Sequence, residues 1–303
     1  FIATDLRARL DPSETFYGFG EQYDRFDRNG GVVTLWQTDD TVGLGKGLAN
    51  ATYKALPIFH SSKPYMVFSN SSYRLRADIG NTNPGEYRLT QHGPIFDYYF
   101  WPSAPDVALK SYTALTGRPP VPPKWAFKPW MGRGGGAWAD GKLKDSLAWS
   151  IGELGDAISE QKAVTNRFAE LDIPHSAIYA EGPTALSREL NEFMASRGIK
   201  VLGYFRPEIG PARQKQLMPE KRADELPILN CGTEKQTATL EYVDFTNPNA
   251  YELCNRALKQ YLELGVAGSM VDFGDWTPRT ARFHDGQSGS EMHNFYCYDY
   301  HRI

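Results

Sequence analysis

The stretch GSMVDFGDWTP, residues 268–278, puts two carboxylates, Asp272 and Asp275, three residues apart directly after a short apolar run. A carboxylate in this position can attack an electrophilic carbon, accept a proton, or simply cap the end of a strand. Glycoside hydrolysis uses one carboxylate at the sugar carbon, another to protonate the leaving oxygen, and aromatic side chains to stack on the ring. The sequence around the stretch has to decide between chemistry and capping.

Two other kinds of mechanism fit the sequence less well. The Asp-Phe-Gly at Asp272 is found in protein kinases, but the chain has no upstream His-Arg-Asp and no glycine-rich loop with a strand lysine. GLGKGLAN at Gly43 lacks the Gly-Lys-Ser/Thr ending of a phosphate loop, and GRGGG at Gly132 is not a Gly-x-Gly-x-x-Gly turn. No Gly-x-Ser-x-Gly elbow is present, although His293 could be a base or a structural residue beside a helix start. Carboxylate chemistry on a sugar is therefore favoured.

Length and composition narrow the class of protein. The chain has 303 residues, 41% of them hydrophobic, which suffices for one large or two ordinary globular domains. Its net charge of -3 offers no basic excess for nucleic acid, and no apolar run approaches the roughly 20 residues that span a bilayer. Three cysteines without CxxC spacing indicate neither a zinc site nor a disulfide framework. We expect no nucleic-acid partner, no membrane, no metal and no cofactor.

The first third of the chain has the pattern of antiparallel sheet. Residues 73–79 alternate apolar with charged side chains after an Asn-Ser-Ser turn, a period of two that predicts a half-buried strand. A helix is first expected in PDVALKSYTALTG, residues 105–117. GRPPVPPKW, residues 117–125, then holds four prolines, which favours a stiff connector between two domains.

Beyond Trp125 the periodicity alternates between strand and helix. Strands are predicted at 125–132, 176–182, 199–207 and 266–275, and helices at 158–171, 186–198 and from Asn247-Pro248 onward. Such alternation indicates a parallel sheet, either doubly wound or half of a (β/α)8 barrel. In both folds, chemistry lies at the carboxyl ends of the strands.

That rule selects a small set of residues. The predicted strand ends are Trp130 to Arg133, Glu181, Arg206-Pro207, and Asp272 to Asp275. A single acid at a strand end is often only a helix cap or half of an ion pair. Two of the four strand ends carry carboxylates and two carry arginine, and together they indicate a functional site at this edge of the sheet.

Several segments, taken in order, resemble glycoside hydrolase family 31, the retaining α-glycosidases, over nearly the whole chain. They are FYGFGEQYDRFDRNG at Phe16, LWQTDD at Leu35, ALTGRPPVPPKWAF at Ala114, PWMGR at Pro129, DFTNPNAY at Asp244, MVDFGDWTP at Met270 and FHDGQSGSEMHNFYCYDY at Phe283. The resemblance implies an α/β plus all-β fold. Residues 1–117 would form part of an N-terminal antiparallel β-sandwich, and residues 118–303 strands 1–4 of a (β/α)8 TIM barrel.

The resemblance also implies roles for particular residues. Asp272 would be the nucleophile that forms a glycosyl-enzyme, and the family's general acid would lie on a later strand, beyond this chain. The chain alone is therefore expected to be an inactive fragment. The carbohydrate substrate would be bound by Asp275, where the family has Glu, by Glu181 of the second strand, by Trp130 and Arg133 at the first-strand tip, and by Thr38 and Asp39 of a loop from the sandwich.

Two departures bear on the substrate. Met270 stands where similar α-xylosidases have lysine, and EGPTALSREL, residues 181–190, is too short for the sulfonate-binding loop of sulfoquinovosidases. Glucosides, galactosides and other hexosides stay open. Two alternatives also stay open: a non-catalytic carbohydrate-binding relative of the same fold, and an unrelated doubly wound α/β protein.

Overall fold

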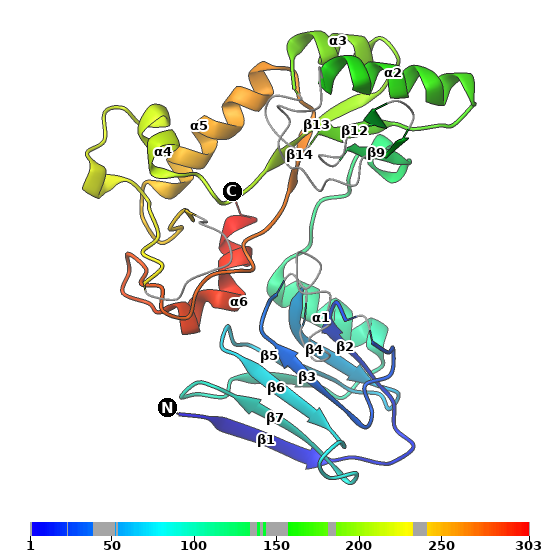
Figure 1. Ribbon diagram of the computed structural model, residues 1–303. Coiled ribbons are helices and arrows are strands. Elements are labelled where there is room, and N and C mark those ends of the chain that lie inside the picture. Colours follow the sequence, from blue (N-terminus) through cyan, green and yellow to red (C-terminus); the bar gives the residue numbers. More distant parts are fainter. Residues whose placement is uncertain are drawn as a thin grey trace.

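The computed structural model describes residues 2–22, 24–38, 52, 54–133, 138–139, 142–143, 157–180, 186–232 and 241–302. Within them, two antiparallel four-stranded sheets lie at one end of the molecule and a parallel four-stranded sheet with helices lies at the other (Figure 1). A short hairpin of β10 (Trp138–Ala139) and β11 (Lys142–Leu143) completes the strands. None of the described helices combines the length and apolar character needed to span a membrane.

The two antiparallel sheets face one another across a shared core. The first has the order β1-β7-β6-β3, and the second β2-β4-β5-β8. Their bounds are β1 (Thr4–Arg9), β2 (Phe16–Gly20), β3 (Gly31–Leu35), β4 (Ala55–Ser61), β5 (Met66–Ser69), β6 (Leu75–Ile79), β7 (Glu86–Gln91) and β8 (Tyr98–Trp101). Leu35 of one sheet and Phe59 of the other belong to the same buried cluster. The strand predicted at 73–79 is confirmed in β6, and the pair of sheets is sandwich-like.

The parallel sheet follows the order of the chain. Its strands are β9 (Trp130–Arg133), β12 (Ala177–Ala180), β13 (Lys200–Phe205) and β14 (Gly268–Val271), and the sheet order is β14-β13-β12-β9. Helices α2 (Ala157–Glu170), α3 (Arg188–Ala195) and α5 (Ala250–Glu263) occupy the segments between them, with α4 (Pro211–Leu217) and the 3₁₀ turn η4 (Ala223–Glu225) before α5. A doubly wound sheet reverses its strand order at a switch point. These four strands show no reversal, and closure into a barrel stays a prediction.

Two boundaries differ from the sequence prediction. The aromatic run 125–132 is strand only from Trp130, because Lys124–Phe127 form a 3₁₀ turn, η1. The helix expected from Asn247-Pro248 begins at Ala250, since the Asn247 side chain accepts a hydrogen bond (2.9 Å) from the amide of Asn249. That bond closes a turn before the helix, which asparagine favours through its own backbone contacts.

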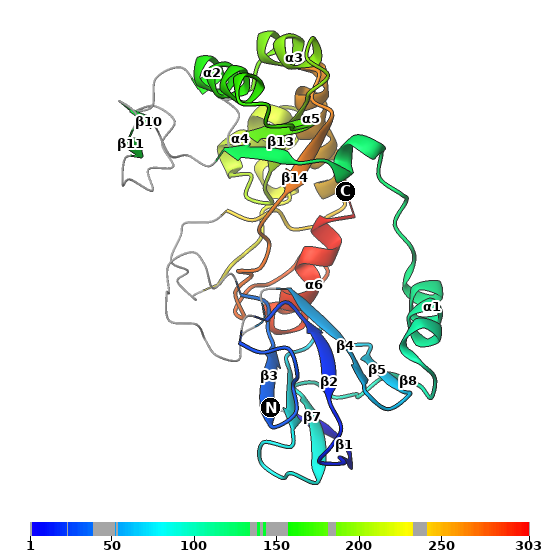
Figure 2. The ribbon, with the colours of Figure 1, turned by 90° about the vertical axis from the view of Figure 1, so that its right-hand side faces the viewer.

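Two segments connect the ends of the molecule. Residues 117–123 run as an extended connector from α1 (Pro105–Thr116), beside the antiparallel sheets, to the parallel sheet (Figure 2). Helix α6 (Gly289–Tyr300) lies between the parallel and antiparallel sheets in both views (Figures 1 and 2). A capping box between Ser288 and Glu291 starts it, an arrangement typical of Ser-x-x-Glu at a helix start. The domain boundary at 117/118 stays a prediction.

Candidate active site

Asp272 directly follows β14, at the carboxyl end of the parallel sheet. Its backbone N–H donates to the carbonyl of Phe205 (3.1 Å), so the residue still continues the pairing with β13. Its Oδ2 accepts from the hydroxyl of Tyr204, and its Oδ1 accepts from the backbone N–H of Phe273 (2.9 Å). Both carboxylate oxygens therefore have donors that fix the direction of the side chain.

The turn after Asp272 is strained. Phe273 has φ 67° and Gly274 has φ 96°, two successive residues in the left-handed region. For a phenylalanine this conformation costs on the order of 1–3 kcal/mol, and such strain gathers at functional sites. At Gly274 an added Cβ would also lie 3.2 Å from the Sγ of Cys297 on α6. The turn is thus held against α6, and glycine is required there.

Two tyrosines fix the end of β13. The hydroxyl of Tyr261 on α5 donates to the carbonyl of Tyr204 (3.1 Å), and that of Tyr300 on α6 donates to the carbonyl of Phe205 (2.7 Å). Tyr204 itself is only 7% exposed. Because its backbone and ring are both held, its hydroxyl is a well-placed donor to Asp272.

An arginine and a buried glutamate lie beside this pair. The Nε of Arg206 donates to Glu208 (2.9 Å), and its guanidinium lies 4.3 Å from the ring centroid of Phe273. The Arg206 side chain is 35% exposed, and its terminal amino groups have no protein acceptor in the described part of the chain. The guanidinium therefore keeps donors for a ligand next to Asp272.

Glu208 differs from an ordinary buried acid because it is only half satisfied. Its side chain is 8% exposed, and its Oε1 has no hydrogen-bond partner among the described residues. Burial raises the pKa of Glu208, the charge and hydrogen bond of Arg206 lower it, and the charge of Asp272 raises it further, with a net rise. A carboxyl group with a free oxygen and a raised pKa can hold a proton beside the nucleophile candidate.

Asp275 and Arg133 lie at the expected end of the sheet. Asp275 is 6% exposed, and its charge acts on Tyr242 and Cys297, so its surroundings are the buried side of the turn. Arg133 ends β9, opposite Ala180. Their predicted contacts with a substrate stay predictions.

Trp130 begins β9 and so lies at the other end of the sheet. It is opposite Ala177, which is opposite Lys200, the first residue of β13. Asp272 lies beyond the far end of β13, about six residues or roughly 20 Å away at the usual strand rise. The ring is 43% exposed and stacks on Trp125 at 5.9 Å. This arrangement does not bring Trp130 and Asp272 together.

The loop from the sandwich is described only in part. Thr38 donates from its amide to the carbonyl of Thr52 (3.1 Å) and from its hydroxyl to the carbonyl of Trp36 (3.2 Å). Asp39 and Glu181 lie outside the described residues. Gln37, directly before Thr38, is hydrogen-bonded to α6, which also contacts the segment that follows Asp272. Helix α6 therefore links Thr38 to the candidate site.

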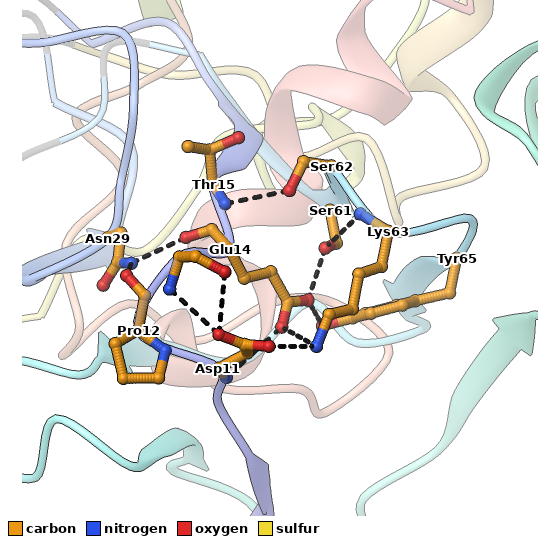
Figure 3. Close-up of polar contacts among 10 residues, drawn as sticks. Asp11, Pro12, Glu14, Thr15, Asn29, Ser61, Ser62, Lys63 and Tyr65 are labelled. Atoms are coloured by element: carbon orange, nitrogen blue, oxygen red, sulfur yellow. Dashed lines mark hydrogen bonds and ion pairs between the residues drawn. The ribbon is translucent and has the colours of Figure 1, made fainter.

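A second carboxylate cluster lies in the sandwich (Figure 3). Glu14, 3% exposed, accepts at Oε1 from the hydroxyls of Ser61 and Tyr65, while its Oε2 lies 3.5 Å from the amide of Asp11 and 3.5 Å from Lys63 Nζ. Each oxygen of this glutamate has a partner. We therefore assign the cluster to the stability of the sandwich and not to ligand binding.

The sequence prediction missed Tyr204 and Glu208. Both belong to the predicted strand segment or its end, and Arg206 between them had been noted as a strand-end residue. The available signal was a tyrosine, Tyr204, near the end of the predicted strand that precedes the strand ending at Asp272. In the described part of the chain, no group of three or more His, Cys, Asp or Glu side chains has a geometry suited to a metal ion.

Comparisons with known proteins agree with this fold. The family profile for the glycosyl hydrolase 31 N-terminal galactose mutarotase-like domain matches residues 3–78. The α-xylosidase XylQ of Lactiplantibacillus pentosus is 28% identical over 95% of this chain, and an α-xylosidase of Emericella nidulans is 25% identical over 98%. The chain spans about 38% of the length of either. α-Glucosidases and sulfoquinovosidases are among the other relatives.

A solved structure gives the same result at the level of the fold. The family 31 dextranase of Flavobacterium johnsoniae, complexed with glucose, superposes with a TM-score of 0.80 at 21% identity, over 99% of this chain and 38% of that one. The chain is a relative of glycoside hydrolase family 31.

Proposed function

We propose that the protein containing this chain is a retaining α-glycoside hydrolase that acts on α-linked hexosides or oligosaccharides. The observation that carries the proposal is Asp272, fixed at the carboxyl end of β14 by donors from Tyr204 and Phe273. The relatives of the chain are α-glycosidases, and they support the same class of reaction.

The proposed reaction has two steps. An oxygen of Asp272 attacks the anomeric carbon while the bond to the glycosidic oxygen breaks, and a general acid protonates that oxygen as it leaves. The deprotonated general acid then takes a proton from water as that water attacks the anomeric carbon, the ester bond to Asp272 breaks, and both the Asp272 carboxylate and the acid are regenerated. From the resemblance we expect the general acid on a later strand than those of this chain.

The neighbouring residues would serve the first step. Tyr204 would hold the attacking carboxylate in line, and the open amino groups of Arg206 would donate to hydroxyls of the bound sugar. Glu208 would keep Arg206 oriented through its Nε. Asp275, Glu181, Arg133, Thr38 and Asp39 remain the further binding candidates, and Trp130, at the other end of β9, would contact only a part of the substrate that lies away from Asp272.

The test of the proposal is covalent trapping in the complete protein. A fluorinated glycosyl donor slows the second step, so the glycosyl-enzyme accumulates and peptide mass mapping locates it. We expect the added mass on the peptide with Asp272 and none in the Asp272→Asn variant. A stable adduct on any other carboxylate would overturn the assignment.

The sugar is tested separately with a panel of aryl α-glycosides. Met270 in β14 argues against the lysine-dependent recognition expected of similar α-xylosidases, whereas two of the relatives are α-xylosidases. We expect aryl α-glucoside or α-galactoside to be hydrolysed with a higher kcat/KM than aryl α-xyloside. A preference for the xyloside would show that Met270 does not decide the substrate.

A non-catalytic carbohydrate-binding protein of the same fold is the second candidate. It is favoured by Asp275, which replaces the longer glutamate of the family and is buried. This candidate predicts saturable sugar binding in calorimetry together with no adduct and no turnover in the trapping experiment.

A further inference from the structure

Helix α6 is the element through which the candidate site meets the sandwich. It follows the strained turn in sequence and lies between the parallel sheet and the antiparallel sheets (Figure 2). Toward the parallel sheet, Tyr296 and Tyr300 donate to the carbonyls of Val243 and Phe205, each at 2.7 Å. Toward the sandwich, consecutive polar residues of the same helix bind the backbone that leaves β3.

His293 is the first of these residues and is 4% exposed. Its Nδ1 lies 2.6 Å from the carbonyl oxygen of Thr277, and its Nε2 lies 2.7 Å from the carbonyl oxygen of Gln37. Carbonyl oxygens only accept, so each of these contacts is made through a hydrogen on the ring nitrogen. The ring of Trp36 stacks on the imidazole, with ring centroids 3.7 Å apart and an interplanar angle of 4°.

Asn294 is the second. Its Nδ2 donates to the carbonyl of Leu35 (3.0 Å), and its Oδ1 accepts from the amide of Gln37 (2.9 Å). The side-chain amide thus pairs with the backbone at the end of β3 in the way that a neighbouring strand would. Beside it, the hydroxyl of Tyr73 donates to Glu291, at 3.1 Å.

We propose that His293 and Asn294 are positioning residues that hold Gln37 and Thr38 against the segment after Asp272, so that Thr38 and Asp272 serve one substrate site. We call this pair the His293–Asn294 clamp. Thr277 lies five residues after Asp272, and Gln37 directly precedes Thr38. The single side chain of His293 therefore contacts both the segment after Asp272 and the segment before Thr38. The proposal rests on the proposed function, because it assigns Thr38 to substrate binding.

The clamp also changes the meaning of a sequence feature. His293 had been considered as a base for a nucleophilic mechanism, but both of its nitrogens are engaged by carbonyl oxygens. Its nitrogens are therefore directed at backbone carbonyls and not at a nucleophile. Its effect on a reaction has to pass through the position of the backbone it holds.

The test uses His293→Gln and Asn294→Asp in the complete protein. The glutamine side chain lacks the rigid imidazole ring and cannot contact the carbonyls of both Thr277 and Gln37. The aspartate side chain has no N–H to donate to the carbonyl of Leu35. We expect KM to rise about tenfold with kcat changed less than about threefold, because Thr38 contributes to binding, and displacements near 1 Å can cost up to a hundredfold. Met292→Leu is the matched control, since Met292 is 3% exposed on the same helix but packs in the core with Tyr296, and it should leave KM unchanged.

The outcomes separate the two proposals. No turnover and no trapping in the wild-type protein would contradict the proposed function, whereas normal turnover with unchanged KM in both folded variants would overturn the clamp. If both variants unfold in thermal melts, Tyr73→Phe decides. It removes one part-buried hydrogen bond to Glu291, and it should raise KM about twofold. A wild-type KM in that variant would then count against the clamp.

Discussion

Two carboxylate clusters of this chain contain similar groups and arrange them differently. The sandwich cluster, around Glu14, and the strand-end cluster, around Asp272 and Glu208, each combine a buried glutamate, a tyrosine hydroxyl and a basic side chain. Both oxygens of Glu14 have partners, while Oε1 of Glu208 has none in the described part of the chain. A closed network of this kind stabilises a fold, whereas an open one leaves polar groups for a ligand.

The two glutamates consequently titrate in opposite directions. At Glu14, burial by itself would raise the pKa, but the hydrogen bonds from Ser61 and Tyr65 and the charge of Lys63 outweigh burial, and the pKa falls below its usual value. At Glu208, burial is offset only in part by Arg206, and the pKa rises. The number of donors around each carboxyl group therefore decides the sign of the shift.

The largest contrast is expected from removing Asp272, the proposed nucleophile. Asp272→Asn should lower kcat on the order of 10⁴-fold, because an amide cannot form the glycosyl ester. Glu14→Gln should leave kcat within about twofold of the wild type, since it lies in a structural network. Steady-state rates with an aryl α-glycoside measure both. Comparable rate losses in the two variants would remove the functional distinction between the clusters.

Two tyrosines give the second contrast. Tyr204→Phe should slow formation of the glycosyl-enzyme about 10- to 100-fold, because Asp272 loses the donor that orients it. Tyr65→Phe removes the corresponding hydroxyl from Glu14 and should lower the stability of the sandwich by about 1–2 kcal/mol without changing that rate. Pre-steady-state trapping measures the rates and urea unfolding the stabilities. A normal trapping rate in Tyr204→Phe would show that the backbone amide of Phe273 suffices.

How far the sequence predicts this molecule depends on the range of the interaction concerned. Asp272 could be predicted at a strand end because an apolar run, an acid and a glycine follow one another locally. The parallel sheet could be predicted from alternating periods, and β13 and β14 were found where expected. These features depend on residues within about ten positions of each other.

The partners of Asp272 and His293 could not be predicted in this way. Tyr204 is 68 residues from Asp272, and Gln37 is 256 residues from His293, so only the sheet register and the packing of α6 bring them together. The start of α5 differs from the predicted start for a local reason, because the Asn247 side chain closes a turn before the helix.

The third contrast is the effect of pH on the sandwich cluster. Because the pKa of Glu14 is lowered by folding, its stabilisation is present above its unfolded pKa, near the ordinary value of 4.5, and is lost as the pH falls through the folded value. Glu14→Gln should therefore cost about 2 kcal/mol at pH 7 and much less at pH 3. Urea unfolding of the sandwich at the two pH values, monitored by limited proteolysis, measures the difference in unfolding free energy between the variant and the wild type. An equal cost at both would mean that the charge of Glu14 is not what the network stabilises.

The smallest expected effect is the sharpest test of the comparison, because its sign is reversed. Folding raises the pKa of Glu208, so the stability this group contributes is present below its unfolded pKa, near 4.5, and is lost as the pH rises through the folded value. Glu208→Gln imitates the neutral acid and still offers Arg206 an acceptor. The free energy of unfolding of the variant, relative to that of the wild type, should increase by on the order of 1 kcal/mol as the pH rises from 4 to 8. This is the usual scale of one buried polar interaction. If Glu208→Gln instead lost stability toward pH 8, as Glu14→Gln should, Glu208 would be a satisfied carboxylate, and the open oxygen that distinguishes the strand-end cluster would not exist in solution.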